Sequence, residues 1–225
     1  MSAVFITATG TDIGKTFVTA GLIRHIRGSG GAIAAIKPVV SGFDPEAWQE
    51  SDPAVLLAAL GRPVVLAEVE RISPWRFKAP LSPHLASARE GRTIVFRDVV
   101  EFCRKSIAVD GMVLIEGIGG IMVPLDDRHT VLDLMSMLRI PAILVAGSYV
   151  GTISHTLSAL EVMARRNLDI AAVVISASEG SAASLEDTVA SIAQFADAID
   201  VIALPRLPAG TSDHPALARI AALIA

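Results

Sequence analysis

The sequence predicts a doubly wound α/β fold, in which a mainly parallel sheet carries helices on both faces. Short runs rich in Ala, Val, Ile and Leu alternate with segments of helical period along all 225 residues. Strands buried on both faces of a parallel sheet have this composition, and regular strand–helix alternation is typical of this architecture. The expected strands are Val4–Ala8, Ala32–Lys37, Met112–Glu116, Ala142–Ala146, Ala172–Ser176 and Val201–Leu204.

The expected helices lie between or after these strands, where apolar residues recur every three or four positions. The stretch from Ser41 to Arg92 is the least regular, because prolines interrupt it repeatedly, and so long a segment between strands is often functional. No repeat or linker-like change of composition divides residues 1–225, so we expect a single domain. The expected helices are Lys15–Arg27, Val95–Ile107, Val131–Leu138, Ser154–Arg166, Leu185–Ala196 and Pro215–Ile224.

Composition limits the classes of function. The chain is 52% hydrophobic, which is enough for a large core, and its net charge of −4 provides no basic surface for nucleic acid or an acidic membrane. Ile140–Leu160 carries no formal charge, yet proline and glycines interrupt it, so we expect a strand and a helix there and not a membrane span. The start of the chain lacks a basic segment typical of a secretory signal. A lone Cys103, expected in a helix and buried, suits a reducing compartment, and we predict a cytoplasmic protein.

Residues 6–17, ITATGTDIGKTF, have the features of a phosphate-binding loop. Gly14-Lys15-Thr16 stands where the first strand meets the first helix, so backbone N–H groups and the positive helix end converge there. Gly14 permits close approach, Lys15 supplies a point charge for the β- and γ-phosphates, and Thr16 offers a hydroxyl to Mg²⁺. The usual leading glycine is replaced by Thr9, but none of these roles requires it. The alternative is an ordinary strand-to-helix turn with an exposed lysine.

Three charged residues are candidates to complete this site. Glu116 ends a buried strand before the flexible turn 117–120, and Mg²⁺ favours one or two carboxylates together with phosphate oxygens. Asp52 is a weaker candidate, because an Asp before Pro-Ala and an apolar helix is most often an N-cap. Lys37 ends the second strand and could place a second cation over the transferring γ-phosphate. For Lys37 and Glu116, the alternative is a solvated charge at a strand end.

Taken together, these residues resemble the dethiobiotin synthetase family of biotin biosynthesis. The matching blocks follow one another through most of the chain, and the second and fifth are specific beside a phosphate loop. They are TGTDIGKT (9–16), KPVVSG (37–42), SD (51–52), SPH (82–84) with AREG (88–91), EGIGG (116–120) and ILVAG (143–147).

The resemblance implies a homodimeric P-loop enzyme that uses Mg-ATP, CO2 or bicarbonate, and 7,8-diaminononanoate. CO2 would form a carbamate on one amine, the γ-phosphate would activate it as a mixed anhydride, and the second amine would close the ureido ring. Lys15 and Lys37 are the implied catalytic residues, neutralising phosphate and carbamate charge. The metal would be held by Thr16, Asp52 and Glu116.

The resemblance also implies a substrate and a nucleotide site. Ser41 would contact the diamine, and Gly151, Thr152 and Ile153 would receive the substrate carboxylate across the dimer interface. Residues 151–154 independently read as a helix start with free N–H groups. The implied nucleotide-binding residues are Asp12, Ile13, Gly14, Lys15, Thr16, Phe17, Asp52, Glu116, Gly117, Ile118, Gly119, Ser176, Ala177, Pro205, Arg206 and Leu207.

The chain departs from the family pattern in places that bear on the base and on the substrate tail. Ala8 replaces the family's leading glycine, Gly10 replaces an acidic residue, and Asp12 replaces a glutamate. Ser176 stands where an adenine-reading asparagine is common, and a tyrosine expected after residue 180 is absent, with Thr188 nearby. The family's Gly-x-x-Pro block becomes Ala203-Leu204-Pro205.

Three other functions are compatible with a P-loop. A regulatory or partitioning ATPase would carry a signature lysine five residues before the loop lysine, where this chain has Gly10. A related ATP-dependent amidoligase usually needs an additional domain, and a non-catalytic nucleotide-binding module would not require Lys37, Glu116 and Ser41 in register. The spacing of His84, His129 and His155 matches no metal-ligand pattern.

Overall fold

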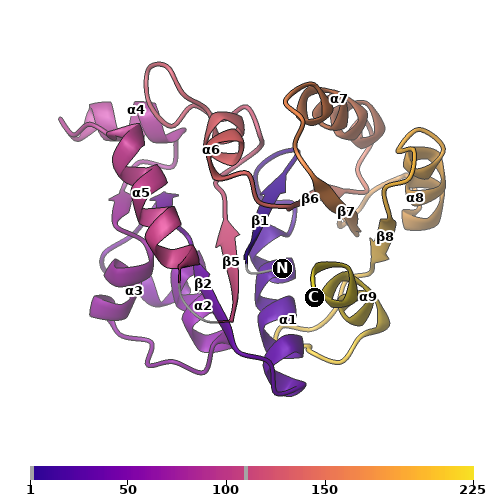
Figure 1. Cartoon of the computed structure of the whole chain (residues 1–225), viewed down its shortest axis with the longest axis horizontal. Helices are drawn as coiled ribbons and strands as arrows, with labels where there is room; N and C mark the ends of the chain where they lie inside the picture. Colours follow the sequence, from indigo (N-terminus) through magenta and orange to yellow (C-terminus); the bar gives the residue numbers. More distant parts are fainter. Residues whose placement is uncertain (1–2, 109–110) are drawn as a thin grey trace.

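The computed structural model describes residues 3–108 and 111–225, and a parallel sheet runs through them (Figure 1). Within these residues the main sheet has six strands in the order β2-β5-β1-β6-β7-β8, and each pair of neighbours is parallel. The predicted fold class is therefore confirmed. The strands are β1 Ala3–Ala8, β2 Ile33–Ile36, β5 Met112–Glu116, β6 Ala142–Gly147, β7 Ile170–Ser176 and β8 Val201–Leu204.

Helices cover both faces of this sheet, because right-handed crossovers in opposite directions place their helices on opposite sides. The chain turns one way from β1 to β2 through α1 (Lys15–Gly28), and α9 (Pro215–Ile224) packs beside α1. From β2 onward it progresses the other way, through β5, β6, β7 and β8. Figure 1 shows α6 and α7 together at the top of the view and α1 and α9 lower down. The helices of the second group are α5 Phe96–Ile107, α6 Val131–Leu138, α7 Thr152–Arg165 and α8 Leu185–Ala193.

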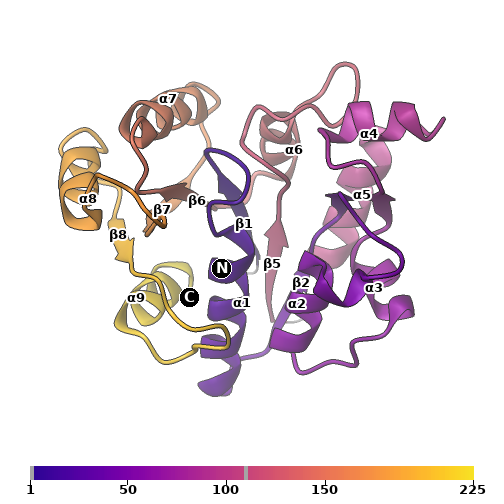
Figure 2. The ribbon, with the colours of Figure 1, turned by 180° about the vertical axis from the view of Figure 1, so that it is seen from behind.

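The stretch between residues 41 and 92 is more regular than the sequence suggested. Figure 2 shows its helices stacked along one side of the molecule, next to β2. Pro53 and Pro83 lie in the first turns of α2 and α4, where proline begins a helix and does not break one. The expectation of an irregular segment was wrong for this reason. The elements are β3 Val39–Ser41, η1 Trp48–Glu50, α2 Asp52–Ala59, α3 Leu66–Ile72, β4 Trp75–Phe77 and α4 Pro83–Arg89, with β3 and β4 forming a small parallel sheet.

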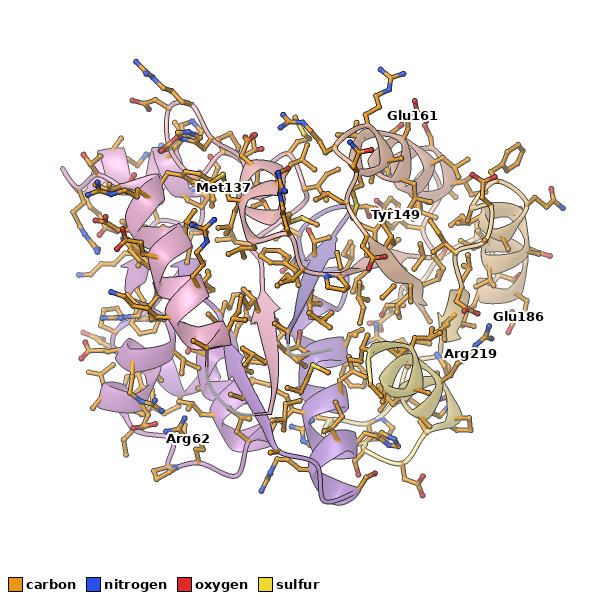
Figure 3. The ribbon with its side chains drawn as sticks, viewed as in Figure 1. Arg62, Met137, Tyr149, Glu161, Glu186 and Arg219 are labelled. Carbon is orange, nitrogen blue, oxygen red and sulfur yellow. The ribbon has the colours of Figure 1, made fainter. Side chains whose placement is uncertain are left out.

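The core lies between the sheet and its helices. Phe5 and Ile6 of β1 and Ile115 of β5 are fully buried, as expected for central strands covered on both faces. Other charged side chains lie at the periphery, and Figure 3 shows Glu161 and Glu186 on the outer sides of α7 and α8. This burial holds the carboxyl edge of the sheet, from which the loops of the site emerge, in a fixed position.

The uncharged stretch 140–160 forms β6 and α7, as predicted. Helix α7 begins earlier than expected, at Thr152, because Gly151 adopts φ 99° and serves as its N-cap. Among the described residues, no helix combines the length and the apolar character needed to cross a membrane.

Cys103 provides a direct probe of this core. Its side chain on α5 is fully buried, and burial raises the pKa of its thiol to about 12. At pH 8 the native thiolate fraction is then about one in ten thousand, whereas an exposed cysteine has a pKa near 8.5. We expect Ellman's reagent to label Cys103 at the rate of global unfolding, and rapidly in urea. Fast labelling of the native protein, with no loss of circular dichroism, would contradict this packing.

Candidate active site

The phosphate loop connects β1 to α1 and presents its backbone toward the carboxyl edge of the sheet. Gly14 is the N-cap of α1 with φ 99°, a left-handed conformation that glycine adopts without strain. Because glycine has no side chain to cap the helix, the first N–H groups of α1 stay available to an anion. Lys15 is 7% exposed, and its Nζ donates to the carbonyl of Gly10 at 3.0 Å. The loop thus combines free N–H groups with one nearly buried ammonium.

The surroundings of Lys15 favour the binding of a negatively charged group. Burial, and then the positive charge of Lys37, lower the pKa of Lys15 to about 8, although Glu116 and Asp52 partly oppose this shift. A phosphate placed against the ammonium would relieve both effects, since an opposite charge stabilises the protonated form. The electrostatics of the loop therefore favour binding of an anion.

Sheet order brings Lys37 and Glu116 together. Strand β5 lies between β1 and β2, and Ile36 pairs with Ile115, so the residues that follow, Lys37 and Glu116, are opposite one another. Lys37 Nζ lies 2.6 Å from Glu116 Oε1 and 2.8 Å from Asp52 Oδ2, and Thr16 Oγ1 donates to Glu116 Oε1 at 2.7 Å. Four residues from four separate segments of the chain thus meet at one point.

These charges stabilise one another, and two of them lie in a nearly dry environment, whereas the side chain of Asp52 is 46% exposed. Lys37 is 3% exposed and Glu116 is fully buried. Burial opposes the charge of Lys37, but the carboxylates of Glu116 and Asp52 outweigh it and raise its pKa. Burial likewise disfavours ionised Asp52, yet Lys37 outweighs this and lowers the pKa of Asp52. Lys37 and Asp52 are consequently expected to be charged at neutral pH.

The alternative interpretations of these three residues were wrong. Lys37 and Glu116 are not solvated strand ends, because the register of β2 and β5 buries them against each other. Asp52 is not the N-cap of α2. That position belongs to Ser51, and Asp52 begins the helix with its carboxylate on Lys37.

The site has the chemistry of a magnesium ligand set. Glu116 Oε2 is buried and, within residues 3–108 and 111–225, has no hydrogen-bond partner. Such an oxygen favours an added cation, and Mg²⁺ prefers carboxylate, hydroxyl and phosphate oxygens. Across those same residues, no group of three or more His, Cys, Asp and Glu side chains could hold a metal by itself. The set formed by Thr16, Asp52 and Glu116 would be completed by phosphate oxygens of a nucleotide.

A cavity of about 410 Å³ opens over the loop and these charges. It contains Lys15, Thr16, Lys37 and Asp52 together with Ser41, the residue predicted to contact the diamine. Ile118 and Gly119 also line it, whereas Gly117 lies beneath, with its carbonyl accepting from Lys37 at 3.3 Å. Thr11 and Val40 also line this cavity and were not predicted as site residues, although they lie within the matching blocks 9–16 and 37–42.

A second cavity of about 360 Å³ lies beside the first, where β7 and β8 end. It adjoins Gly14, and a Cβ atom placed there would come within 2.7 Å of Ser176 Oγ. Ser178 and Glu179, which follow the end of β7, also line this cavity and were not predicted as site residues. The structure brings the predicted nucleotide-binding residues of this region together, and Asp12, Ile13, Gly14, Phe17, Ser176, Ala177, Pro205, Arg206 and Leu207 all line the cavity.

The predicted carboxylate-binding residues lie elsewhere. Gly151, Thr152 and Ile153 form the start of α7 and line neither of these cavities. Thr152 Oγ1 donates to the Gly147 carbonyl at 2.7 Å, which fixes the first turn of the helix to the end of β6. Figure 3 shows Tyr149 close to this turn. Within one copy of the chain, this helix start is separate from the phosphate loop cavity.

Comparison with solved structures places the fold among P-loop ATPases. The cell division ATPase MinD of Pyrococcus furiosus superposes with a TM-score of 0.58 over 100% of this chain and 98% of its own, at 16% identity. A ParA family ATPase of Chlorobium tepidum gives 0.54 over 92% and 86%, at 12% identity. At these identities the likeness shows the fold alone, and it confirms the predicted P-loop NTPase type.

Relatives found by sequence share a much larger fraction of identical residues with this chain. A family model described as an AAA domain matches residues 2–213. The ATP-dependent dethiobiotin synthetase BioD of Acidiphilium cryptum is 50% identical over 84% of this chain and 85% of its own length. The enzyme of the same name from Caulobacter vibrioides is 47% identical over 92% and 93%. The family model covers all residues that line both cavities, and the chain belongs to the dethiobiotin synthetase family.

Proposed function

We propose that the protein catalyses the ATP- and Mg²⁺-dependent carboxylation and ring closure of 7,8-diaminononanoate with CO2, giving dethiobiotin, ADP and phosphate. The observation that carries this proposal is that Lys15, Lys37 and Asp52 line one cavity at the carboxyl edge of the sheet, where Lys37 is also paired with the buried Glu116. Relatives named ATP-dependent dethiobiotin synthetase are 50% and 47% identical to the chain over the aligned residues.

Each residue has a role that follows from its position. The first turn of α1 and Lys15 would bind the β- and γ-phosphates, since free N–H groups and a buried ammonium face them. Thr16, Asp52 and Glu116 would hold Mg²⁺, which supplies charge neutralisation on the phosphate oxygens when bound. The second cavity, with Ser176 and Arg206, would take the base.

The diamine would lie over the same cavity. The Ser41 hydroxyl would bind an amine, and the Lys37 ammonium would stabilise negative charge on the carbamate and on the phosphoryl group it attacks. The carbamate oxygen attacks the γ-phosphorus with release of ADP, and the second amine then attacks the carbamate carbon and expels phosphate. Binding energy from the substrate tail would hold that amine in line.

The separation of α7 from this cavity supports a homodimer. If Gly151, Thr152 and Ile153 bind the substrate carboxylate, a partner subunit supplies them, because within one copy they line neither cavity. We further propose that residues 1–225 form one P-loop domain, since both cavities are built on one sheet. A cytoplasmic location stays a prediction, supported by the single cysteine.

A partitioning ATPase is a less suitable interpretation, despite the resemblance of folds. Its signature lysine would stand at Gly10, whose carbonyl here accepts a hydrogen bond from Lys15. The direct test of the proposal is to incubate the protein with diaminononanoate, bicarbonate and Mg-ATP and to detect dethiobiotin by mass spectrometry. ATP hydrolysis without formation of dethiobiotin would refute it.

Replacement of Lys15 by alanine should abolish turnover. The loop loses its only side-chain ammonium on the β- and γ-phosphates, and the neighbouring N–H groups cannot replace a full charge. We expect kcat/KM for dethiobiotin formation to fall by far more than tenfold, which corresponds to about 1.4 kcal/mol of barrier. Replacement of the exposed Lys78 by alanine is the matched control. A Lys15→Ala enzyme within tenfold of wild type would exclude the phosphate-loop assignment.

Replacement of Lys37 by methionine should separate binding from catalysis. Methionine keeps the apolar stem and removes the charge, so stabilisation of the transition state is lost while the phosphate loop stays intact. We expect kcat to collapse and Mg-ADP to bind no more weakly than to wild type, measured by steady-state kinetics and calorimetry. If affinity for Mg-ADP fell as far as kcat/KM, Lys37 would be a binding residue and not a catalytic one.

Base recognition should be permissive. An amide both donates to and accepts from the adenine edge, whereas the shorter Ser176 has one rotating hydroxyl that suits either polarity. Phosphates and Mg²⁺ should then supply most of the nucleotide affinity. We expect GTP or CTP to support turnover within about a hundredfold of ATP in kcat/KM, or roughly 2.7 kcal/mol. A preference for ATP well beyond a thousandfold, at saturating diamine and bicarbonate, would show that other groups read the base.

A further inference from the structure

Lys37 lies where a metal ion would have to bind. Its Nζ is 2.6 Å from Glu116 Oε1 and 2.8 Å from Asp52 Oδ2. Thr16 Oγ1 donates to the same oxygen of Glu116 at 2.7 Å. Every residue proposed as a metal ligand is therefore joined to one hydrogen-bonded cluster, and the ammonium of Lys37 is the cation at its centre.

Simultaneous binding of an ammonium and a divalent ion to these oxygens is unfavourable. Lys37 is 3% exposed and Glu116 is fully buried, so water screens their charges poorly. Two positive charges within a few ångströms repel strongly in such surroundings. Either the lysine leaves the carboxylates when the metal arrives, or the metal binds weakly.

A cavity next to Lys37 can accommodate its displaced ammonium. The side chain of Lys37 lines the cavity of about 410 Å³ that also contains Lys15 and Ser41. A lysine carries its charge on four flexible methylene groups, so rotation of the stem can move the ammonium without moving β2. The destination is the part of the cavity where phosphate and diamine are proposed to react.

We propose that Lys37 is an exchangeable cation: a metal ion on Thr16, Asp52 and Glu116 displaces its ammonium from the carboxylates into the reaction cavity. This inference rests on the proposed function and adds an order of events to it. The charge that stabilises the carbamate and the transferring phosphoryl group would reach its place only after the metal has bound. An enzyme without metal would keep that charge neutralised by its own carboxylates.

The exchange predicts that Lys37 competes with the metal. The apparent affinity for the metal is reduced in proportion to the fraction of molecules whose carboxylates are free of Lys37. Removal of the Lys37 ammonium should therefore strengthen metal binding. A lysine that contributed only to catalysis would leave metal affinity unchanged. The sign of the effect therefore distinguishes the two roles, and it can be measured without turnover.

The test uses Mn²⁺ alone, titrated into the full-length, nucleotide-free protein, with free Mn²⁺ followed by electron paramagnetic resonance. We expect Lys37→Met to bind Mn²⁺ about tenfold or more tightly than wild type. Lys15→Met is the matched control. It removes one positive charge beside the same site, but Lys15 Nζ donates to the Gly10 carbonyl, so its effect should be much smaller. Mn²⁺ affinity of Lys37→Met equal to or below that of wild type or of the control would overturn the inference.

Loss of the buried ion pair could also unfold the variant. Lys37→Gln keeps a hydrogen-bond donor for Glu116, and the shift of its thermal midpoint with Mn²⁺ gives a second measurement. A larger shift than in wild type supports the exchange, and an equal or smaller shift overturns it. The outcome is separate from the proposed function. Dethiobiotin formed by wild type, together with unchanged Mn²⁺ affinity of the variant, would refute only the exchange.

Discussion

The buried contact of Lys37 with Glu116 and Asp52 is the interaction on which the site depends. It joins the end of β2, the end of β5 and the start of α2, and Thr16 of the phosphate loop is attached to it through Glu116. A buried charge without its partner is strongly destabilising, so each of these segments holds the others in place. The order of the sheet makes the contact possible, because β5 is inserted between β1 and β2.

Two cavities divide the work of the site. One contains the charges and the predicted diamine contact, and the other contains the ends of β7 and β8. The buried charges lie beside the first cavity, where bonds would form and break, and the neighbouring cavity would take the base. The start of α7 is outside both, which makes a second subunit part of the proposed mechanism. Similar folds occur in a cell division ATPase and in a ParA family ATPase, so topology alone does not assign the function.

Much of this could be predicted from the sequence, for identifiable reasons. Continuous apolar runs marked all six strands of the main sheet in the described part of the chain, because strands buried on both faces have a distinctive composition. Glu116 and Lys37 could be found because each ends such a run. The role of Asp52 was harder to predict, since an Asp before Pro also suits an N-cap, and only the path from β2 to α2 brings it to Lys37. The regular structure between residues 41 and 92 was missed because proline both starts helices and interrupts them.

The contact between Gly14 and Ser176 has a consequence for how these sequences diverge. A Cβ at position 14 would lie 2.7 Å from the Ser176 hydroxyl, so the phosphate loop rests directly on the end of β7. Positions 14 and 176 are in close proximity, so a larger side chain at 176 would displace the backbone of the proposed phosphate loop. If these residues bind nucleotide as proposed, nucleotide selectivity and phosphate affinity are not independent traits of this protein. A mutation that sharpens recognition of the base must also preserve the shape of the loop, which narrows the evolutionary routes by which such selectivity can be gained or lost.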